Sequence, residues 1–157
     1  METAEWYLFF HLAGVFLLLA AAGLTTGTAV AAGRTRSAGT VVTLLDIQRA
    51  SELYVTSAGA ILTIIFGSLL VDKAGYGFGE AWISTAYTLF IVILAVDHGY
   101  FLRQNRKIRV AAAEAGDGAV TAEVRGMLAN PVLTAAGVLM DLGFVVFLWL
   151  MIAKPGN

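Results

Sequence analysis

The stretch WYLFFHLAGVFLLLAAAGLTTGTAVAA, residues 6–32, decides the fold, because none of its 27 residues is Asp, Glu, Lys or Arg. A helix needs about 20 predominantly apolar residues to cross the hydrocarbon core of a bilayer. Three more stretches have this character: residues 53–71 and 81–96 are uncharged, and residues 126–153 contain one charged residue, Asp141. The sequence therefore predicts an all-α protein, a bundle of four transmembrane helices.

The composition agrees with this class of protein. Hydrophobic residues make up 59% of the 157 residues and charged residues 13%, against about 45–50% and about 25% in soluble domains. We expect a single membrane domain over residues 1–157, because one such bundle uses the whole length. Its helices are predicted at about residues 5–32, 51–71, 81–103 with a cytoplasmic extension to about 115, and 126–153. The absence of cysteine excludes disulfides, iron–sulfur clusters and thiolate metal sites.

Basic residues are distributed unevenly between the links. The first and third links together hold eight of them: Arg34, Arg36, Arg49, Arg103, Arg106, Lys107, Arg109 and Arg125. The middle link and the C-terminal end hold one each, Lys73 and Lys154. Basic residues near helix ends favour the cytoplasmic side, so the N-terminus and the C-terminus are both predicted to lie outside. We expect a multi-pass protein of the inner (plasma) membrane, in a bacterial cell.

Asp141 is the sharpest polar signal within an apolar stretch. Counted from Pro131 at about 1.5 Å per residue, it lies about 15 Å into the fourth helix, near the centre of the bilayer. A central Asp costs roughly 2.5–3.5 kcal/mol, so we expect it to face the bundle interior and to have a partner or a proton. It is either a proton or cation site, a counter-ion for a cofactor, or a protonated carboxyl bonded to a hydroxyl.

His11 lies about 9 Å inside the first helix by the same helical rise. It shares one face with Tyr7 and Thr25, which together form a thin polar stripe on an apolar helix. A membrane histidine ligates haem or copper, relays protons, or is held in a structural hydrogen bond. Gly23 and Gly27 form a GxxxG pair, which predicts that another helix packs closely there.

A second polar group is predicted at the cytoplasmic level of the second and third helices. Because a short turn joins these helices, they are expected to be antiparallel neighbours. Glu52, Asp97 and His98 then converge with Arg49. Two carboxylates and an imidazole suit a divalent cation or a proton-access site, while a salt-bridge cluster that fixes helix ends is the alternative. His98 lies too far from His11 for both to bind one haem.

The first stretch, with His11 two turns into it, resembles uncharacterised four-helix membrane proteins related to copper-resistance protein D. The segment ELYVTSAGAILTIIFGSLLV, residues 52–71, followed by a Gly/aromatic turn and Trp82, resembles their second and third helices. The resemblance implies a small four-helix bundle that handles haem b or copper through membrane histidines. Among the residues of this chain, only His11 carries over as a cofactor-binding residue.

The sequence favours a non-catalytic accessory, scaffolding or small-ligand-binding bundle over an enzyme, because it contains no nucleophile–base pair, metal motif or phosphate-binding loop. Two alternatives stay open. One is a haem- or copper-binding membrane redox protein that uses His11. The other is a proton-coupled carrier or channel that uses Asp141, with Glu52, Asp97 and His98 at its inner access. Expected partners are membrane lipids and a homo-oligomer or larger membrane complex, and no nucleic acid.

Overall fold

The computed structural model describes residues 2–116 and 118–155, and the regular elements in this part of the chain are helical. Two segments, η1 and η2, are π-helical. The elements are α1 (Thr3–Arg34), α2 (Ala38–Ser51), η1 (Glu52–Thr56), α3 (Ser57–Lys73), α4 (Ala81–Val96), η2 (Asp97–Phe101), α5 (Leu102–Glu114), α6 (Ala122–Leu128) and α7 (Pro131–Ala153).

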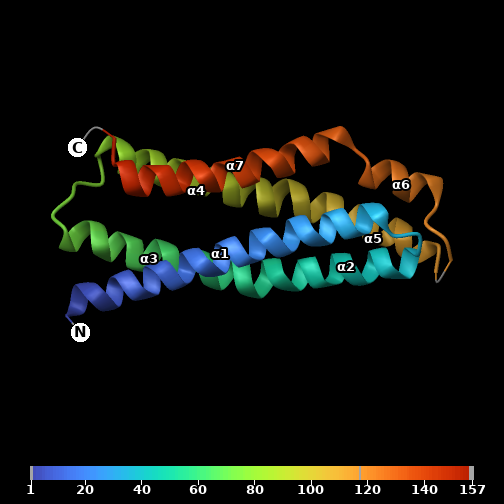
Figure 1. Cartoon of the computed structure of the whole chain (residues 1–157), viewed down its shortest axis with the longest axis horizontal. Coiled ribbons are helices and arrows are strands. Elements are labelled where there is room, and N and C mark those ends of the chain that lie inside the picture. Colours follow the sequence, from blue (N-terminus) through green and yellow to red (C-terminus); the bar gives the residue numbers. More distant parts are fainter. Residues whose placement is uncertain (1, 117, 156–157) are drawn as a thin grey trace.

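These elements join into four long rods that lie side by side (Figure 1). The rods are 32 to 36 residues long, and each is long and apolar enough to cross a membrane. This confirms the predicted class, an all-helical protein with four helices able to span a bilayer. At about 1.5 Å per residue each of the first three rods measures about 50 Å, whereas the hydrocarbon core is about 30 Å thick. These rods therefore extend well beyond the core. The fourth is broken between α6 and α7, where Asn130 is extended.

The start of α1 and the end of α7 lie at one end of the bundle, which we call the terminal end (Figure 1). The opposite end carries α2, α5 and α6, and we call it the basic end. The second rod begins at Ala38, well before the expected residue 51. Ser37 caps this start by accepting a hydrogen bond from the Thr40 backbone N–H, so most of the first link is helical.

Two apolar clusters hold the rods together. The cluster at the basic end joins α2, α5 and α6 through Val41, Leu45, Ile108, Ala112 and Val124. The second lies within the apolar spans and joins Leu18 of α1, Ala60 of α3 and Phe90 of α4, with Phe144 and Phe147 of α7 packed against it.

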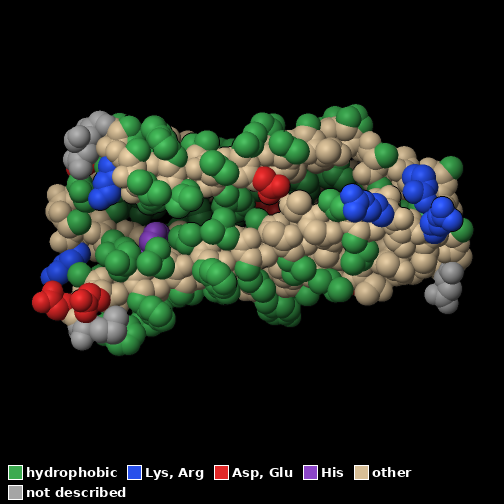
Figure 2. Space-filling view, viewed as in Figure 1, with side chains coloured by type: hydrophobic (Ala, Val, Ile, Leu, Met, Phe, Trp, Pro, Cys, Tyr) green, Lys and Arg blue, Asp and Glu red, His purple; other side chains and the backbone are tan. Residues whose placement is uncertain are grey.

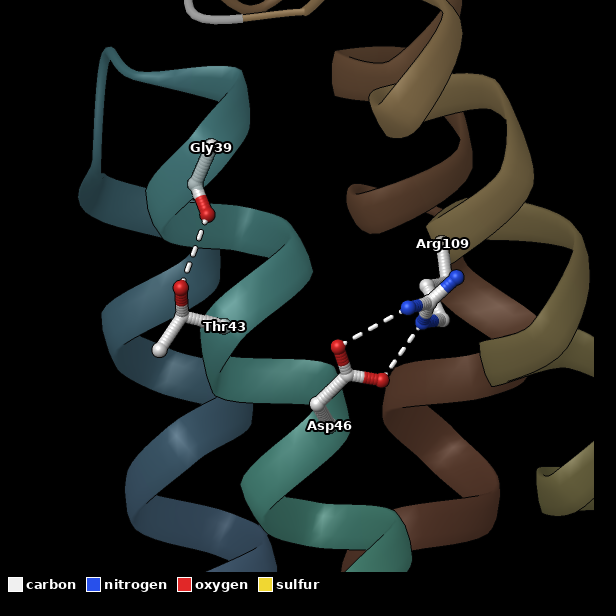
Figure 3. A network of polar contacts seen from close by, with 4 residues as sticks. All are labelled: Gly39, Thr43, Asp46 and Arg109. Carbon is white, nitrogen blue, oxygen red and sulfur yellow. Dashed lines mark hydrogen bonds and ion pairs between the residues drawn. The ribbon is translucent and has the colours of Figure 1, made fainter.

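An ion pair on the surface of the basic end also links α2 to α5. Arg109 donates from Nε and Nη2 to the two carboxyl oxygens of Asp46, and the second distance is 2.9 Å (Figure 3). In the same view, the Thr43 hydroxyl donates to the Gly39 carbonyl within α2. The two-pronged geometry fixes the guanidinium plane, because both hydrogen bonds must form together.

A close helix crossing joins α1 to α3 and depends on two glycines. A Cβ on Gly14 would lie 2.7 Å from the Thr63 backbone nitrogen, and one on Gly59 would lie 2.9 Å from the Gly14 carbonyl oxygen. No helix within the described chain packs closely at Gly23 and Gly27, since a Cβ at either would meet nothing within 4 Å outside its own helix backbone. The crossing lies about two and a half turns nearer the start of α1 than that pair.

The helices form two layers, with α1 beside α3 in one and α4 beside α7 in the other (Figure 1). Figure 2 shows a recess along the face between these layers, which we call the furrow. It has a histidine at its border toward the terminal end and an acidic group about midway along. At the terminal end the Tyr87 hydroxyl of α4 bonds to the Ser68 hydroxyl of α3 and so links the layers.

Candidate functional site

His11 is held in a fixed orientation by the backbone of α3. Its Nδ1 lies 3.0 Å from the carbonyl oxygen of Thr63. A carbonyl oxygen only accepts hydrogen bonds, so Nδ1 must carry the proton in this contact. The neutral imidazole then presents Nε2 as a lone pair, and no hydrogen bond to Nε2 forms within the described part of the chain. The ring can therefore accept a hydrogen bond from a ligand or coordinate a metal.

The residues around His11 leave room for the imidazole and hold α1 against α3. A Cβ on Gly67 would lie 2.9 Å from His11 Nδ1, so the ring occupies space that this glycine leaves open. Beside it, the Phe10 and Phe66 rings stack with centroids 4.8 Å apart, and Tyr7 tilts against Phe66 at 6.2 Å. These aromatic contacts join α1 to α3 on the side of His11 nearer the terminal end.

Thr63 and Gly67 were not singled out in the sequence. A small residue four positions after a hydroxyl residue is the only available signal, and such spacings are common in membrane helices. Thr63 is 6% exposed, and its hydroxyl oxygen is buried without a hydrogen-bond partner among the described residues. It lies against Gly14 at the same crossing that supports His11.

His11 is the residue of α1 that could hold a haem iron or a copper ion. Copper needs several nitrogen or sulfur ligands. The chain has no cysteine and its other histidine, His98, lies in η2 beyond α4, so further sulfur ligands would have to come from its four methionines. Within residues 2–116 and 118–155, no three His, Asp or Glu residues come together to hold a metal ion. A porphyrin supplies four ligands itself, so one proximal imidazole is sufficient. His11 fits that role through Nε2.

The two predicted inner carboxylates each begin a π-helical segment, Glu52 in η1 and Asp97 in η2. Glu52 is 2% exposed and accepts a hydrogen bond of 3.2 Å from the Gln48 amide. No hydrogen bond or ion pair joins this carboxyl to Asp97 in the described chain. The π-helical turns that carry both carboxylates are rare and are found frequently at functional sites.

His98 adjoins Asp97 without forming a hydrogen bond to it. The His98 Nδ1 and Asp97 Oδ2 atoms are 3.3 Å apart, which is an ion-pair distance, yet Oδ2 has no hydrogen-bond partner in the described chain. The structure thus joins Glu52 to Gln48 and brings Asp97 near His98. Because no group of three suitable side chains is found in the described ranges, metal binding by these residues stays a prediction that the geometry does not favour.

Asp141 has a hydroxyl partner on the neighbouring helix. Thr26 of α1 donates toward its two carboxyl oxygens at 3.3 and 3.5 Å, which bridges α1 and α7. Asp141 thus has a partner on another helix, and both residues of the pair are exposed.

The other predicted polar residues of α1 are partly buried, and the fully buried one was missed. Tyr7 and Thr25 have intermediate exposure. Thr28 is 6% exposed and donates to the Leu24 and Thr25 carbonyl oxygens within its own helix. That local bonding satisfies its hydroxyl, so Thr28 provides no group for a ligand.

Residues 6–155 match the family described as "Predicted integral membrane protein (DUF2269)". The match covers nearly the whole chain, and the protein therefore belongs to this family. No curated protein and no solved structure matches it. The family description supports integration into a membrane and specifies no activity.

Proposed function

We propose that this member of the DUF2269 family is a non-catalytic, small-ligand-binding bundle of the plasma membrane. The ligand is a mostly apolar molecule that lies in the furrow and is held by Nε2 of His11. One observation carries this proposal: the Thr63 carbonyl fixes the Nδ1–H side of the ring and leaves Nε2 without a protein hydrogen bond in the described chain.

The surroundings of the imidazole support a binding role. Polar groups at membrane depth are costly and are usually functional, and a half-bonded imidazole in hydrocarbon leaves one acceptor unpaired. Histidines that bind metals or ligands are commonly oriented by a carbonyl bonded to the other ring nitrogen. Gly67 preserves the space that this orientation needs.

Haem b is the second candidate, and the same proximal geometry favours it. A bound haem would supply one-electron redox chemistry at the membrane. Nε2 of His11 would bind the haem iron, while the Thr63 carbonyl oxygen would keep the ring oriented through its hydrogen bond with Nδ1. The resemblance to proteins related to copper-resistance protein D supports this candidate. Copper would need methionine sulfur as its further ligand, because the chain has no cysteine and His98 lies in η2.

The charge pattern supports the proposed orientation. The basic end carries Arg34, Arg36, Arg49, Arg103, Arg106, Lys107, Arg109 and Arg125. We therefore assign the basic end to the cytoplasm and both termini to the outside of a bacterial inner membrane. In this orientation His11 lies toward the outer leaflet.

Analysis of co-purifying compounds tests the proposal. Wild type, His11→Ala and His98→Ala are purified from membranes in a mild detergent, and each is examined by absorption spectroscopy and by mass spectrometry of an organic extract. His98→Ala is the matched control, because its side chain is 43% exposed and lies in η2. We expect a compound in wild type and His98→Ala that is lost from His11→Ala, and a Soret band would identify it as haem.

Two results would contradict the proposal. One is the absence of any compound above the level in a mock purification. The other is equal retention of the compound by His11→Ala and wild type, which would place its binding elsewhere.

A further inference from the structure

A cavity of about 480 Å³ lies at the basic end, where the α2–η1 rod faces α5. Its volume falls within the range of about 300–1,000 Å³ usual for small-molecule sites. Its lining includes four arginines, one amide and one carboxyl: Arg49, Arg103, Arg106, Arg109, Asn105 and Glu52. Leu45, Leu53 and Leu102 complete the wall. The cavity is therefore strongly basic, with an apolar part.

The arginines outnumber the acidic groups that could neutralise them. Asp46 engages Arg109 (Figure 3). The other three arginines, Arg49, Arg103 and Arg106, form no ion pair in the described ranges. Only Glu52 opposes them from within the cavity, and its carboxyl already accepts the Gln48 amide. An excess of positive charge thus remains.

Asn105 adds an unpaired donor to the same wall. Its amide nitrogen is buried and has no hydrogen-bond partner within the described chain. Leaving a buried donor unpaired costs free energy, so such a group normally has a protein, water or ligand partner. An anionic oxygen bound among the arginines would satisfy it.

The position of the cavity along the rods selects a lipid as the ligand. Arg49 and Glu52 precede the uncharged run of residues 53–71, and Arg103 and Arg106 follow the uncharged run of residues 81–96. The cavity therefore lies at the ends of the apolar spans, which is the level of the phospholipid headgroups. Basic pockets between transmembrane helices are suited to anionic headgroups, and guanidinium groups bind phosphate through paired hydrogen bonds.

We infer that this cavity binds the phosphodiester headgroup of an anionic phospholipid. Arg49, Arg103 and Arg106 contact the phosphate oxygens together with the Asn105 amide, and the leucines contact the first methylenes of the acyl chains. This site is separate from the His11 site, since its lining residues lie in α2, η1 and α5, nearer the basic end, whereas His11 contacts α3.

Neighbouring residues on α5 provide a matched pair of variants. Arg106 lines the basic cavity, whereas Lys107 lines a neighbouring depression that has Arg103 alone in common with the cavity. Arg106→Gln and Lys107→Gln each remove one positive charge at adjacent positions. If a headgroup binds in the cavity, only Arg106→Gln weakens lipid binding. If the lipid is attracted only by surface charge, both variants weaken it equally.

The experiment measures lipid binding to delipidated protein in a neutral detergent by native mass spectrometry. The probes are phosphatidylglycerol, phosphatidylcholine and inorganic phosphate. We expect phosphatidylglycerol to bind at least about tenfold more tightly than phosphatidylcholine. Arg106→Gln should weaken it by about tenfold or more, the loss typical of a charged hydrogen bond, while Lys107→Gln should leave it unchanged.

Three outcomes would overturn the inference: equal losses in both variants, equal binding of the two lipids, or displacement of phosphatidylglycerol by inorganic phosphate at comparable concentration. The last would make free phosphate the ligand. Size-exclusion chromatography checks that each variant is folded. If Arg106→Gln is not monodisperse, Asn105→Ala replaces it, and unchanged binding by that variant would also overturn the inference.

Discussion

The substitution Gly14→Ala tests the close approach of α1 and α3 that positions His11. The added Cβ would lie 2.7 Å from both the backbone nitrogen and the hydroxyl oxygen of Thr63, and 2.8 Å from the Gly59 carbonyl oxygen. The first distance is about 0.7 Å short of the 3.4 Å at which ordinary contact begins. Two of these three atoms belong to the backbone, so a change of rotamer cannot relieve the overlap, and the helices must separate.

The magnitude follows from two opposing effects. Overpacking of a well-packed contact costs about 1–3 kcal/mol, while replacing Gly by Ala within a helix favours the helix by up to about 1 kcal/mol. Gly23→Ala is the matched control, because its Cβ would meet no described atom within 4 Å. The gain in helix propensity on replacing Gly by Ala is the same in both variants, so it cancels in the comparison. Gly14→Ala should therefore be less stable than Gly23→Ala by about 1–3 kcal/mol, the steric part alone.

Reversible unfolding in mixed micelles, as a function of the SDS mole fraction, measures the free energy of unfolding for both variants. A second readout is the compound retained at His11, which should fall in Gly14→Ala as the His11–Thr63 hydrogen bond lengthens. Equal stability of the two alanine variants, or a greater loss in Gly23→Ala, would refute the reasoning about the α1–α3 crossing.

Three further predictions concern single contacts. Gly67→Ala should lower retention of the compound, measured by absorption and mass spectrometry, because its Cβ would lie 2.9 Å from His11 Nδ1. Full retention would show that the His11 ring does not need the space left by Gly67. Thr26→Val should destabilise the fold by about 1 kcal/mol in the same SDS titration through loss of the bond to Asp141, and an effect no larger than that of Thr25→Val would show that the bond is unimportant. Asp46→Asn and Arg109→Gln should each lower the melting temperature slightly at low salt, and less at high salt; additive losses in the double variant would show that the pair is not coupled.

The four spans could be predicted from the sequence because the hydropathy of a segment depends only on its own residues. Long uncharged runs require a membrane whatever surrounds them. The exact extent of the rods was harder to predict. Residues 38–50 mix apolar and polar residues, and their helix is stabilised by the Ser37 cap and by packing of Val41 and Leu45 against α5 and α6. That packing is tertiary and has no signature within the segment.

In the candidate site, too, some residues could be predicted from the sequence and others could not. His11 and Asp141 stand out because they are polar residues in apolar runs. Their partners, Thr63 and Thr26, are 52 and 115 positions away in the chain, and which residues meet depends on helix register. The GxxxG spacing of Gly23 and Gly27 was misleading for this reason, since a spacing shows that close approach is permitted without showing that a helix is there. The π-helical turns at Glu52 and Asp97 have no hydropathy signal either.

The hydrogen-bonded state of His11 in a bilayer tests the central claim most directly. Solid-state NMR of ¹⁵N-histidine-labelled His98→Ala protein in lipid reports His11 alone, because the chain has two histidines. The account predicts a neutral ring protonated at Nδ1 and hydrogen-bonded there, with Nε2 unprotonated or bound to the ligand. A ring protonated at Nε2 with a bare Nδ1, or one that tumbles freely, would contradict it.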